Sequence, residues 1–172
     1  MMNWVNAYLD SSRSGTGLYW NVVRRDGSID TNVWSYNQGV MIGANVLRYL
    51  VTTNSAYLTQ AASIANTALS YYGNFEGQPP SFNVMLFQNL LMLYPHASAT
   101  LQSTMLQTIQ SYADWAWNTT SARNPKTSLF YFNDAGQPTG GTGQPAQLRD
   151  QGAMTQLYAL LAWSSGDYAK LT

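Results

Sequence analysis

The sequence predicts an all-α fold made of paired helices, with short β-hairpins inserted between the pairs. Most segments carry apolar residues three or four positions apart, which is the spacing of one face of an α-helix. The dipeptide Gln38-Gly39 recurs late in the chain as Gln151-Gly152, and both copies follow a short aromatic segment, at 18–20 and at 129–131. Repeated helix pairs of this kind predict a solenoid or a closed helical toroid, because one pair cannot bury its apolar face alone.

The first half of the chain is predicted to be a β-hairpin followed by two helices, after the tail of a helix at 4–10. Asp26-Gly27, a strong hairpin-turn signal, separates the segments 18–23 and 28–33. A helix should begin at Ser35, with an apolar face formed by Tyr36, Val40, Met41, Ala44, Leu47 and Val51. Gly39 and Gly43 on that helix would let a neighbouring helix approach closely. Asn54 can cap a second helix, which Gly73 can end and whose apolar residues are Leu58, Ala61, Ala65, Ala68 and Tyr72.

The second half is predicted to contain three longer helices. Ser81 would cap the first, which is apolar nearly all round from Val84 to Tyr94 and should be buried on most sides. The next has one apolar face, formed by Leu101, Met105, Ile109, Tyr112 and Ala116. A strand at 129–132, a turn at 133–136 and a loop at 138–145 precede the last long helix, at about 148–164. Asp167 would cap a final turn at 167–171.

The two ends of the sequence resemble cut edges. The chain opens inside a helical pattern and stops one turn into a helix. Residues 1–172 are therefore expected to be an incomplete domain, truncated at both ends. Missing helices would leave an apolar edge, so self-association through that edge is a further expectation.

The composition restricts the class of partner. Only 9% of the 172 residues are charged, and eight Lys and Arg balance eight Asp and Glu, so no broad basic face for nucleic acid or anionic membrane is expected. The absence of Cys and the single His96 argue against a metal site, and no cofactor is expected. No apolar run is long enough for membrane insertion. A surface of amides, hydroxyls and aromatic rings can bind neutral, hydroxyl-rich ligands, or can simply be solvated.

The stretch Trp34-Ser35-Tyr36-Asn37-Gln38 lies where the hairpin meets a helix, and amide N–H groups are unsatisfied there. Trp34 and Tyr36 offer flat faces for the C–H side of a sugar ring, and Asn37 and Gln38 offer donor and acceptor pairs for adjacent hydroxyls. The same residues also suit helix capping and core packing. The sequence leaves both interpretations open.

The stretch Arg149-Asp150-Gln151 occupies the equivalent place in the second copy. A carboxylate at a helix start is favoured by the helix dipole whatever its function, so Asp150 also suits a cap with a local ion pair. Its equivalence to Asn37 favours a binding role. The candidate substrate-binding residues are therefore Trp34, Tyr36, Asn37, Gln38, Asp150 and Gln151.

Several stretches together resemble glycoside hydrolase family 76, which holds bacterial endo-α-1,6-mannanases and fungal cell-wall relatives. Phe75-Glu76-Gly77 is similar to the F-K-G stretch of that family, with Glu76 in place of the usual Lys. The other stretches that carry the resemblance are Gly17-Leu18-Tyr19-Trp20, Asp26-Gly27, Tyr36-Asn37-Gln38-Gly39, Ile42-Gly43-Ala44, Tyr57-Leu58 with Ala61, and Arg149-Asp150-Gln151 with Leu157-Tyr158-Ala159-Leu160-Leu161. The similarity runs over nearly the whole chain, and Tyr-Asn-Gln-Gly is its most specific part.

The resemblance implies an (α/α)6 toroid whose substrate groove lies on the face that carries the starts of the inner helices. It also implies retaining cleavage of α-1,6-mannan by an adjacent Asp-Asp pair without a metal. That pair belongs to the N-terminal half of the family, and this sequence has no Asp-Asp and corresponds to the C-terminal half, so no catalytic residue is assigned. The chain is then expected to supply part of the sugar groove of a secreted or cell-surface enzyme.

Three other functions fit the same sequence. The chain could be a carbohydrate-binding toroid without chemistry, or a helical scaffold that pairs with another protein. A different sugar enzyme on the same toroid would use His96, or Asp30 with Asp150. Glycosidic hydrolysis generally needs two carboxylates roughly 5 to 10 Å apart, and Asp30 and Asp150 are the pair most easily placed in one cleft.

Overall fold

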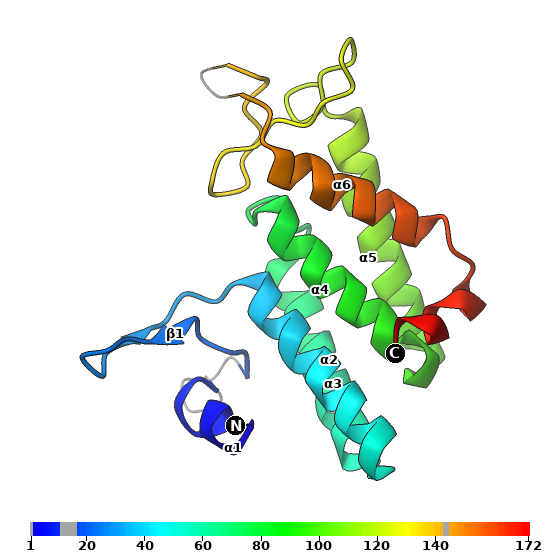
Figure 1. Ribbon diagram of the computed structural model, residues 1–172. Helices are drawn as coiled ribbons and strands as arrows, with labels where there is room; N and C mark the ends of the chain where they lie inside the picture. The colour runs from blue at the N-terminus through cyan, green and yellow to red at the C-terminus, as the bar shows by residue number, and fades with distance from the viewer. Residues whose placement is uncertain (1, 11–16, 143–144) are drawn as a thin grey trace.

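The chain folds into stacked helical hairpins, and a computed structural model describes residues 2–10, 17–142 and 145–172 (Figure 1). Its elements in chain order are α1 (Met2–Tyr8), β1 (Val22–Val23), β2 (Ile29–Asp30), α2 (Ser35–Thr52), α3 (Ala56–Tyr72), α4 (Pro80–Leu93), η2 (Tyr94–His96), α5 (Ala99–Asn118), α6 (Leu148–Leu161) and η3 (Ser165–Leu171). Here η denotes a 3-10 helix. The prediction of an all-α fold with short β-hairpin insertions is confirmed.

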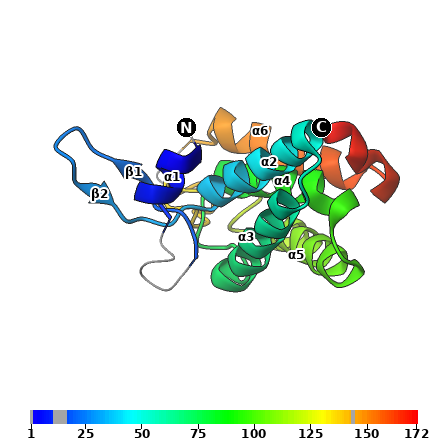
Figure 2. The same ribbon diagram turned by 90° about the horizontal axis from the view of Figure 1, so that it is seen from below.

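The long helices form two layers (Figure 2). We call α2, α4 and α6 the inner layer, in which α4 packs between the other two. The outer layer consists of α3 and α5, which pack against each other and against the inner helices. The order of one inner helix followed by one outer helix is the repeat that the sequence predicts. The first residues of all three inner helices lie at the same end of the layer (Figure 1).

The packing of α2 against α4 depends on two glycines. A Cβ at Gly39 would lie 2.6 Å from the Cα of Leu86, and a Cβ at Gly43 would lie 1.8 Å from the Oδ1 of Asn89. The close approach predicted for these glycines is therefore confirmed. Because the glycines must face α4, they also decide which side of α2 is buried.

The apolar face predicted for α2 is largely wrong. Of that face only Met41 is fully buried, and Val40, Leu47 and Val51 are exposed. The buried residues are Ser35, Gln38, Gly39, Met41, Ile42, Gly43, Asn45 and Val46. Because Gly39 and Gly43 face α4, much of the apolar surface of α2 points away from α4.

The other helices follow the sequence closely. The N-cap of α3 is Ser55 and not the predicted Asn54, whose Oδ1 still accepts the N–H of Ala56 at 3.0 Å from the turn before the helix. Gly73 ends the helix with a φ of 61°. The apolar residues predicted for α5 are all buried. Only Met85 among the large apolar residues of α4 is substantially exposed, so α4 forms the centre of the core.

Several predicted boundaries are wrong. Ser81 does not cap α4, because the helix already begins at Pro80, whose fixed φ suits a first helical position. The strand predicted at 129–132 is reduced to isolated bridges at Phe130 and Phe132. The last long helix ends at Leu161, and the final turn is a 3-10 helix in which Asp167 accepts the backbone N–H of Ser164, the true cap. Positions 143 and 144 of the predicted loop lie outside the described residues.

The hairpin stands apart from the two layers (Figure 1). Val22 pairs with Asp30 and Val23 with Ile29, around the predicted Asp26-Gly27 turn. Within the described ranges, no helix is long and apolar enough to cross a bilayer.

The glycine contact makes a prediction about stability. Gly39→Ala should lower the free energy of unfolding by about 1–3 kcal/mol, because its methyl group overlaps the backbone of α4. Urea denaturation would measure this change. The matched control is Gly152→Ala at the corresponding position of α6, where a Cβ meets nothing within 4 Å. That substitution should stabilise by about 0.5–1 kcal/mol through helix propensity. Equal effects of the two substitutions would contradict the packing argument.

Candidate functional site

The candidate site lies at the end of the inner layer where α2, α4 and α6 begin. The N–H of Ser35 donates to Oε1 of Gln78 at 3.1 Å, and its hydroxyl donates to Oδ1 of Asn83 at 3.1 Å, so the starts of α2 and α4 are joined directly. The turn at 133–136 also reaches the loop that leads into α4, since a Cβ at Gly136 would lie 2.3 Å from the carbonyl carbon of Gln78. We call this end of the layer the helix-start face.

Gln38 holds the hairpin segment against the start of α2. Its Oε1 accepts the N–H of Tyr19 at 2.8 Å, and its Nε2 donates to the carbonyl of Tyr19 at 2.9 Å and to that of Trp34 at 3.1 Å. The side chain has an exposed fraction of 0%. All of its amide groups are therefore occupied by backbone, and it supports the helix-start face from behind.

Gln151 makes the same set of contacts at the start of α6. Its Oε1 accepts the N–H of Phe130 at 3.0 Å, and its Nε2 donates to the carbonyls of Phe130 at 2.7 Å and of Gln147 at 3.3 Å. The repeat seen in the sequence is thus a repeated structural device. We call the two sets the glutamine clasps. Both amides bind backbone groups. The sequence interpretation expected them to bind the hydroxyls of a sugar instead.

Trp34 and Tyr36 form an aromatic cluster with Phe82 of α4. The ring centroids of Tyr36 and Phe82 are 4.6 Å apart, those of Trp34 and Phe82 are 5.6 Å apart, and both pairs meet edge to face. The hydroxyl of Tyr36 donates to Oδ1 of Asn21 at 2.6 Å, which fixes the ring against the hairpin. Asn21 in turn donates to Asp30 at 3.1 Å.

A cavity of about 280 Å³ lies beside this cluster, between α1, the hairpin segment and α2. It contains two of the predicted residues, Tyr36 and Asn37. The Nδ2 of Asn37 is buried and has no hydrogen-bond partner among the described residues. The full lining is Val5, Leu9, Tyr19, Trp20, Asn21, Tyr36, Asn37, Val40 and Met41, and none of these side chains is charged. The cavity therefore suits a neutral ligand with both C–H surface and hydroxyl groups.

Sequence reasoning missed three residues of this region as candidates. Trp20 was used only in the hairpin region and in the family resemblance, Asn21 was placed only in the hairpin region, and Phe82 was not singled out. The signal for Trp20 is present, because it directly follows Tyr19, which the first clasp holds. Nothing in the sequence indicates that Phe82 packs against Tyr36, since the two are joined only by the contact between helices.

Asp150 is fully buried and lies outside this cavity. Its Oδ1 accepts from Nε of Arg149 at 3.1 Å, and its Oδ2 is buried without a partner among the described residues. Burial raises the pKa of Asp150, and the hydrogen bond from Arg149 offsets part of that rise. The structure thus buries Asp150 at the start of α6, and direct contact of Asp150 with a sugar remains a prediction.

The residues of the alternative sugar enzyme do not form one site. His96 lies at the far end of α4, a helix of 14 residues and so about 20 Å from the helix starts, where its ring packs on Tyr49. The carboxylate of Asp30 is engaged by Asn21, Asn32 and Arg24. The backbone N–H of Asn32 is the main reason why the pKa of Asp30 is lowered. Among the residues of known position, no three His, Asp or Glu side chains gather as metal ligands would.

Solved structures with a similar fold are glycoside hydrolases of family 76. One from a bovine strain of Bacteroides thetaiotaomicron has a TM-score of 0.71 and 23% identity, over 93% of this chain and 36% of that one. The α-1,6-mannanase of Salegentibacter sp. HEL1_6 has a TM-score of 0.70 and 23% identity, over 92% of this chain and 50% of that one. An inactive variant of that enzyme, with two neighbouring aspartates replaced by asparagine, is a complex with α-1,6-mannotriose (TM-score 0.70, 21% identity, covering 99% of this chain and 50% of that one).

At these identities the likeness establishes the fold. The resemblance seen in the sequence is confirmed at that level, and the chain spans half or less of the length of these structures. No protein-family model matches the sequence, and no curated protein sequence matches it either.

The buried carboxylate makes a prediction about pH. Burial raises the pKa of Asp150 above the ordinary value of 3.8, so the folded chain binds a proton more readily than the unfolded chain. The stability that protonation of Asp150 contributes is therefore lost as pH rises through the folded-state pKa. Asp150→Asn removes this dependence, and its melting temperature relative to the parent chain should rise as pH increases above the ordinary carboxyl pKa of 3.8.

The control is Asp134→Asn, which removes the exposed acidic partner of the same Arg149. Thermal unfolding followed by circular dichroism at several pH values would measure both variants. The control should show little change of this difference with pH. If the difference in melting temperature between Asp150→Asn and the parent chain were also independent of pH, burial would not raise the pKa of Asp150.

Proposed function

We propose that this chain forms part of the sugar-binding groove of a glycoside hydrolase that acts on α-1,6-mannan. The observation that carries the proposal is the uncharged cavity between α1, the hairpin segment and the first turns of α2, which combines the rings of Trp20 and Tyr36 with the amides of Asn21 and Asn37. Solved structures of the same fold are α-1,6-mannanases, and two are complexes with α-1,6-mannooligosaccharides. The resemblance of the sequence to family 76 supports the same substrate class.

The chemistry of the cavity fits a hexose. The C–H face of a pyranose packs on aromatic rings, and its vicinal hydroxyls bind paired donors and acceptors. The unpartnered Nδ2 of Asn37 supplies a donor that the protein itself does not use. Because Tyr36 is held by Asn21 and Phe82, its ring is already ordered before a sugar binds, which lowers the entropic cost of binding.

We propose that this chain contributes binding rather than the reacting carboxylates. Glycosidic hydrolysis needs a pair of carboxyl groups about 5–10 Å apart. No two acidic residues are adjacent in the sequence, Asp150 is buried, and Asp30 is engaged by its neighbours in the hairpin. Binding without turnover is accordingly expected of this chain when it is isolated, and cleavage of α-1,6-mannotriose by it would contradict this part of the proposal.

The test of the groove is a titration with α-1,6-mannotriose. Tyr36→Ala should weaken binding at least about tenfold, because it removes a stacking ring and the anchor of Asn21. Isothermal titration calorimetry would measure the affinity. The matched control is Tyr71→Ala, which removes an exposed tyrosine of α3 that does not line the cavity. Unchanged affinity of Tyr36→Ala, or an equal loss of affinity in Tyr36→Ala and Tyr71→Ala, would contradict the proposed sugar-binding groove. Either result would favour the interpretation as a helical scaffold.

We also propose that a second copy of the chain covers the exposed apolar side of α2. Val51 has an exposed fraction of 85%, and Leu47 and Leu50 on the same helix are 48% and 43% exposed. An exposed apolar stripe of this kind favours association, because pairing two copies removes it from water.

The isolated chain is accordingly expected to dimerise. Leu47→Lys with Val51→Lys should give a monomer, because two charges cannot be buried in an apolar contact without partners. Light scattering coupled to size-exclusion chromatography would measure the mass. Val22→Lys, at an exposed valine of the hairpin, is the control and should leave the dimer intact. A parent chain that stays monomeric at every concentration would refute the proposal.

A further inference from the structure

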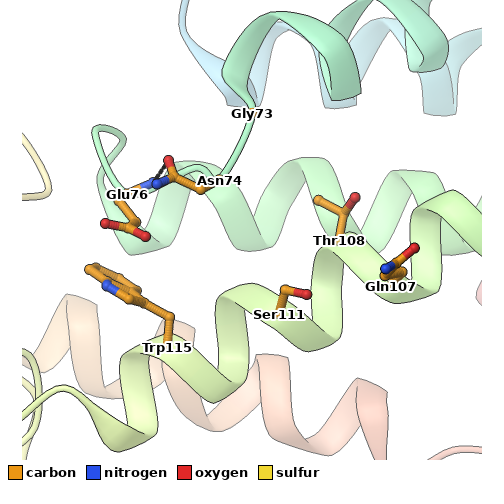
Figure 3. Close-up of a pocket in the computed structure, with 7 residues that line it drawn as sticks. All are labelled: Gly73, Asn74, Glu76, Gln107, Thr108, Ser111 and Trp115. Atoms are coloured by element: carbon orange, nitrogen blue, oxygen red, sulfur yellow. Dashed lines mark hydrogen bonds between the residues drawn. The ribbon is translucent and has the colours of Figure 1, made fainter.

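A second hollow lies on the outer layer, between the loop that joins α3 to α4 and the outer helix α5 (Figure 3). Its volume is about 350 Å³, within the usual range of roughly 300–1,000 Å³ for ligand pockets. It shares no residue with the cavity at the helix-start face. The loop contributes Asn74 and Glu76, and α5 contributes Gln107, Thr108, Ser111 and Trp115.

Three of the polar side chains of this hollow make no hydrogen bond within the described part of the fold. In the described part of the chain, the carboxylate of Glu76, the amide of Gln107 and the hydroxyl of Ser111 have no hydrogen bond or ion pair with another residue. This differs from the helix-start face, where the amides of Gln38 and Gln151 are fully occupied by backbone. Several uncommitted donors and acceptors therefore converge on one cavity, beside one aromatic ring.

The ring of Trp115 and the loop that carries Glu76 are held in place by the core. Trp115 packs on Tyr112 at 5.5 Å between ring centroids, Tyr112 on Phe87 at 5.5 Å, and Phe87 on Phe75 at 5.1 Å. Phe75 is buried, and its carbonyl accepts from Nδ2 of Asn83 at 2.9 Å, which anchors the loop. One continuous series of rings thus connects the two sides of the hollow.

Glu76 follows Phe75 directly, and its backbone N–H donates to Oδ1 of Asn74 at 3.2 Å. Figure 3 shows its carboxylate directed from the loop toward the ring of Trp115. A ligand between them would meet a flat apolar surface on one side and a charged acceptor on the other.

We propose that this hollow is a second carbohydrate site, which takes one neutral mannose unit on the outer wall of the fold. Trp115 packs on the C–H face of the pyranose, and the carboxylate of Glu76 accepts hydrogen bonds from two adjacent hydroxyls. Ser111 and Gln107 form hydrogen bonds with the remaining hydroxyls. Glu76 is the one charged side chain among the lining residues, so the site disfavours anions. The choice of mannose rests on the proposed function, whereas the site rests on the hollow itself.

The indole N–H resonances of the six tryptophans distinguish the two sites in a nuclear magnetic resonance titration. With α-1,6-mannotriose as the probe, the resonance of Trp115 should shift and saturate. Trp115→Phe assigns that resonance. Glu76→Gln should weaken the response at Trp115 at least about tenfold, because a neutral amide replaces a charged acceptor.

Ser111→Phe fills the hollow from an exposed position of α5 and should abolish the response. Ser103→Phe is its matched control, at another exposed serine of the same helix outside the lining, and should leave the response unchanged. Tyr36→Ala should also leave it unchanged.

The outcomes separate the two proposals. A shift at Trp115 without one at Trp20 supports the outer site and overturns the groove. A shift at Trp20 without one at Trp115 overturns the outer site and leaves the groove intact. A shift at Trp115 that persists in Ser111→Phe also overturns the outer site, because the hollow would then not be what binds the sugar.

Discussion

The close approach of α2 to α4 at Gly39 and Gly43 is the constraint on which the rest of the structure depends. Because the two backbones almost touch, Ser35 at the start of α2 can bond Asn83 in the first turn of α4, and the rings of Tyr36 and Phe82 meet. The same contact turns Val51 and its apolar neighbours away from the core. The proposed binding face at one end of the layer and the exposed apolar side of α2 are therefore two results of one packing geometry.

Each glutamine clasp joins the start of a helix to an irregular segment of chain by hydrogen bonds. In each clasp a side-chain amide pairs with both the N–H and the carbonyl of one residue, as a neighbouring β-strand would. The segment before the helix is thereby held without a sheet, which explains why the strands here are so short. Since an unpaired buried peptide group is costly, each clasp is also a condition for burying Tyr19 and Phe130.

Sequence periodicity predicted the helices whose packing is apolar, and it failed where packing uses glycine. The burial of α4 and α5 follows from Leu, Met and Ile at helical spacing, because these residues carry the hydrophobic signal themselves. On α2 the contact is made by Gly39 and Gly43, which carry no such signal, so the predicted face was wrong. Gln38 and Gln151 were found through their repeat, but an amide can bind a ligand or the backbone with equal ease, and its partner is set only in three dimensions.

The distribution of polar groups is consistent with the two proposed surfaces for neutral ligands on a chain with only 9% charged residues. Where the inner helices begin, the amides of Gln38 and Gln151 bind backbone, so we expect specificity there to come from the rings and from the unpartnered Nδ2 of Asn37. On the outer wall the core supplies only rigidity, through the ring series that ends at Trp115, and leaves the polar groups free. Rigid rings with free hydrogen-bonding groups bind sugars at low entropic cost, so a low charge density is consistent with recognition by stacking and neutral hydrogen bonds.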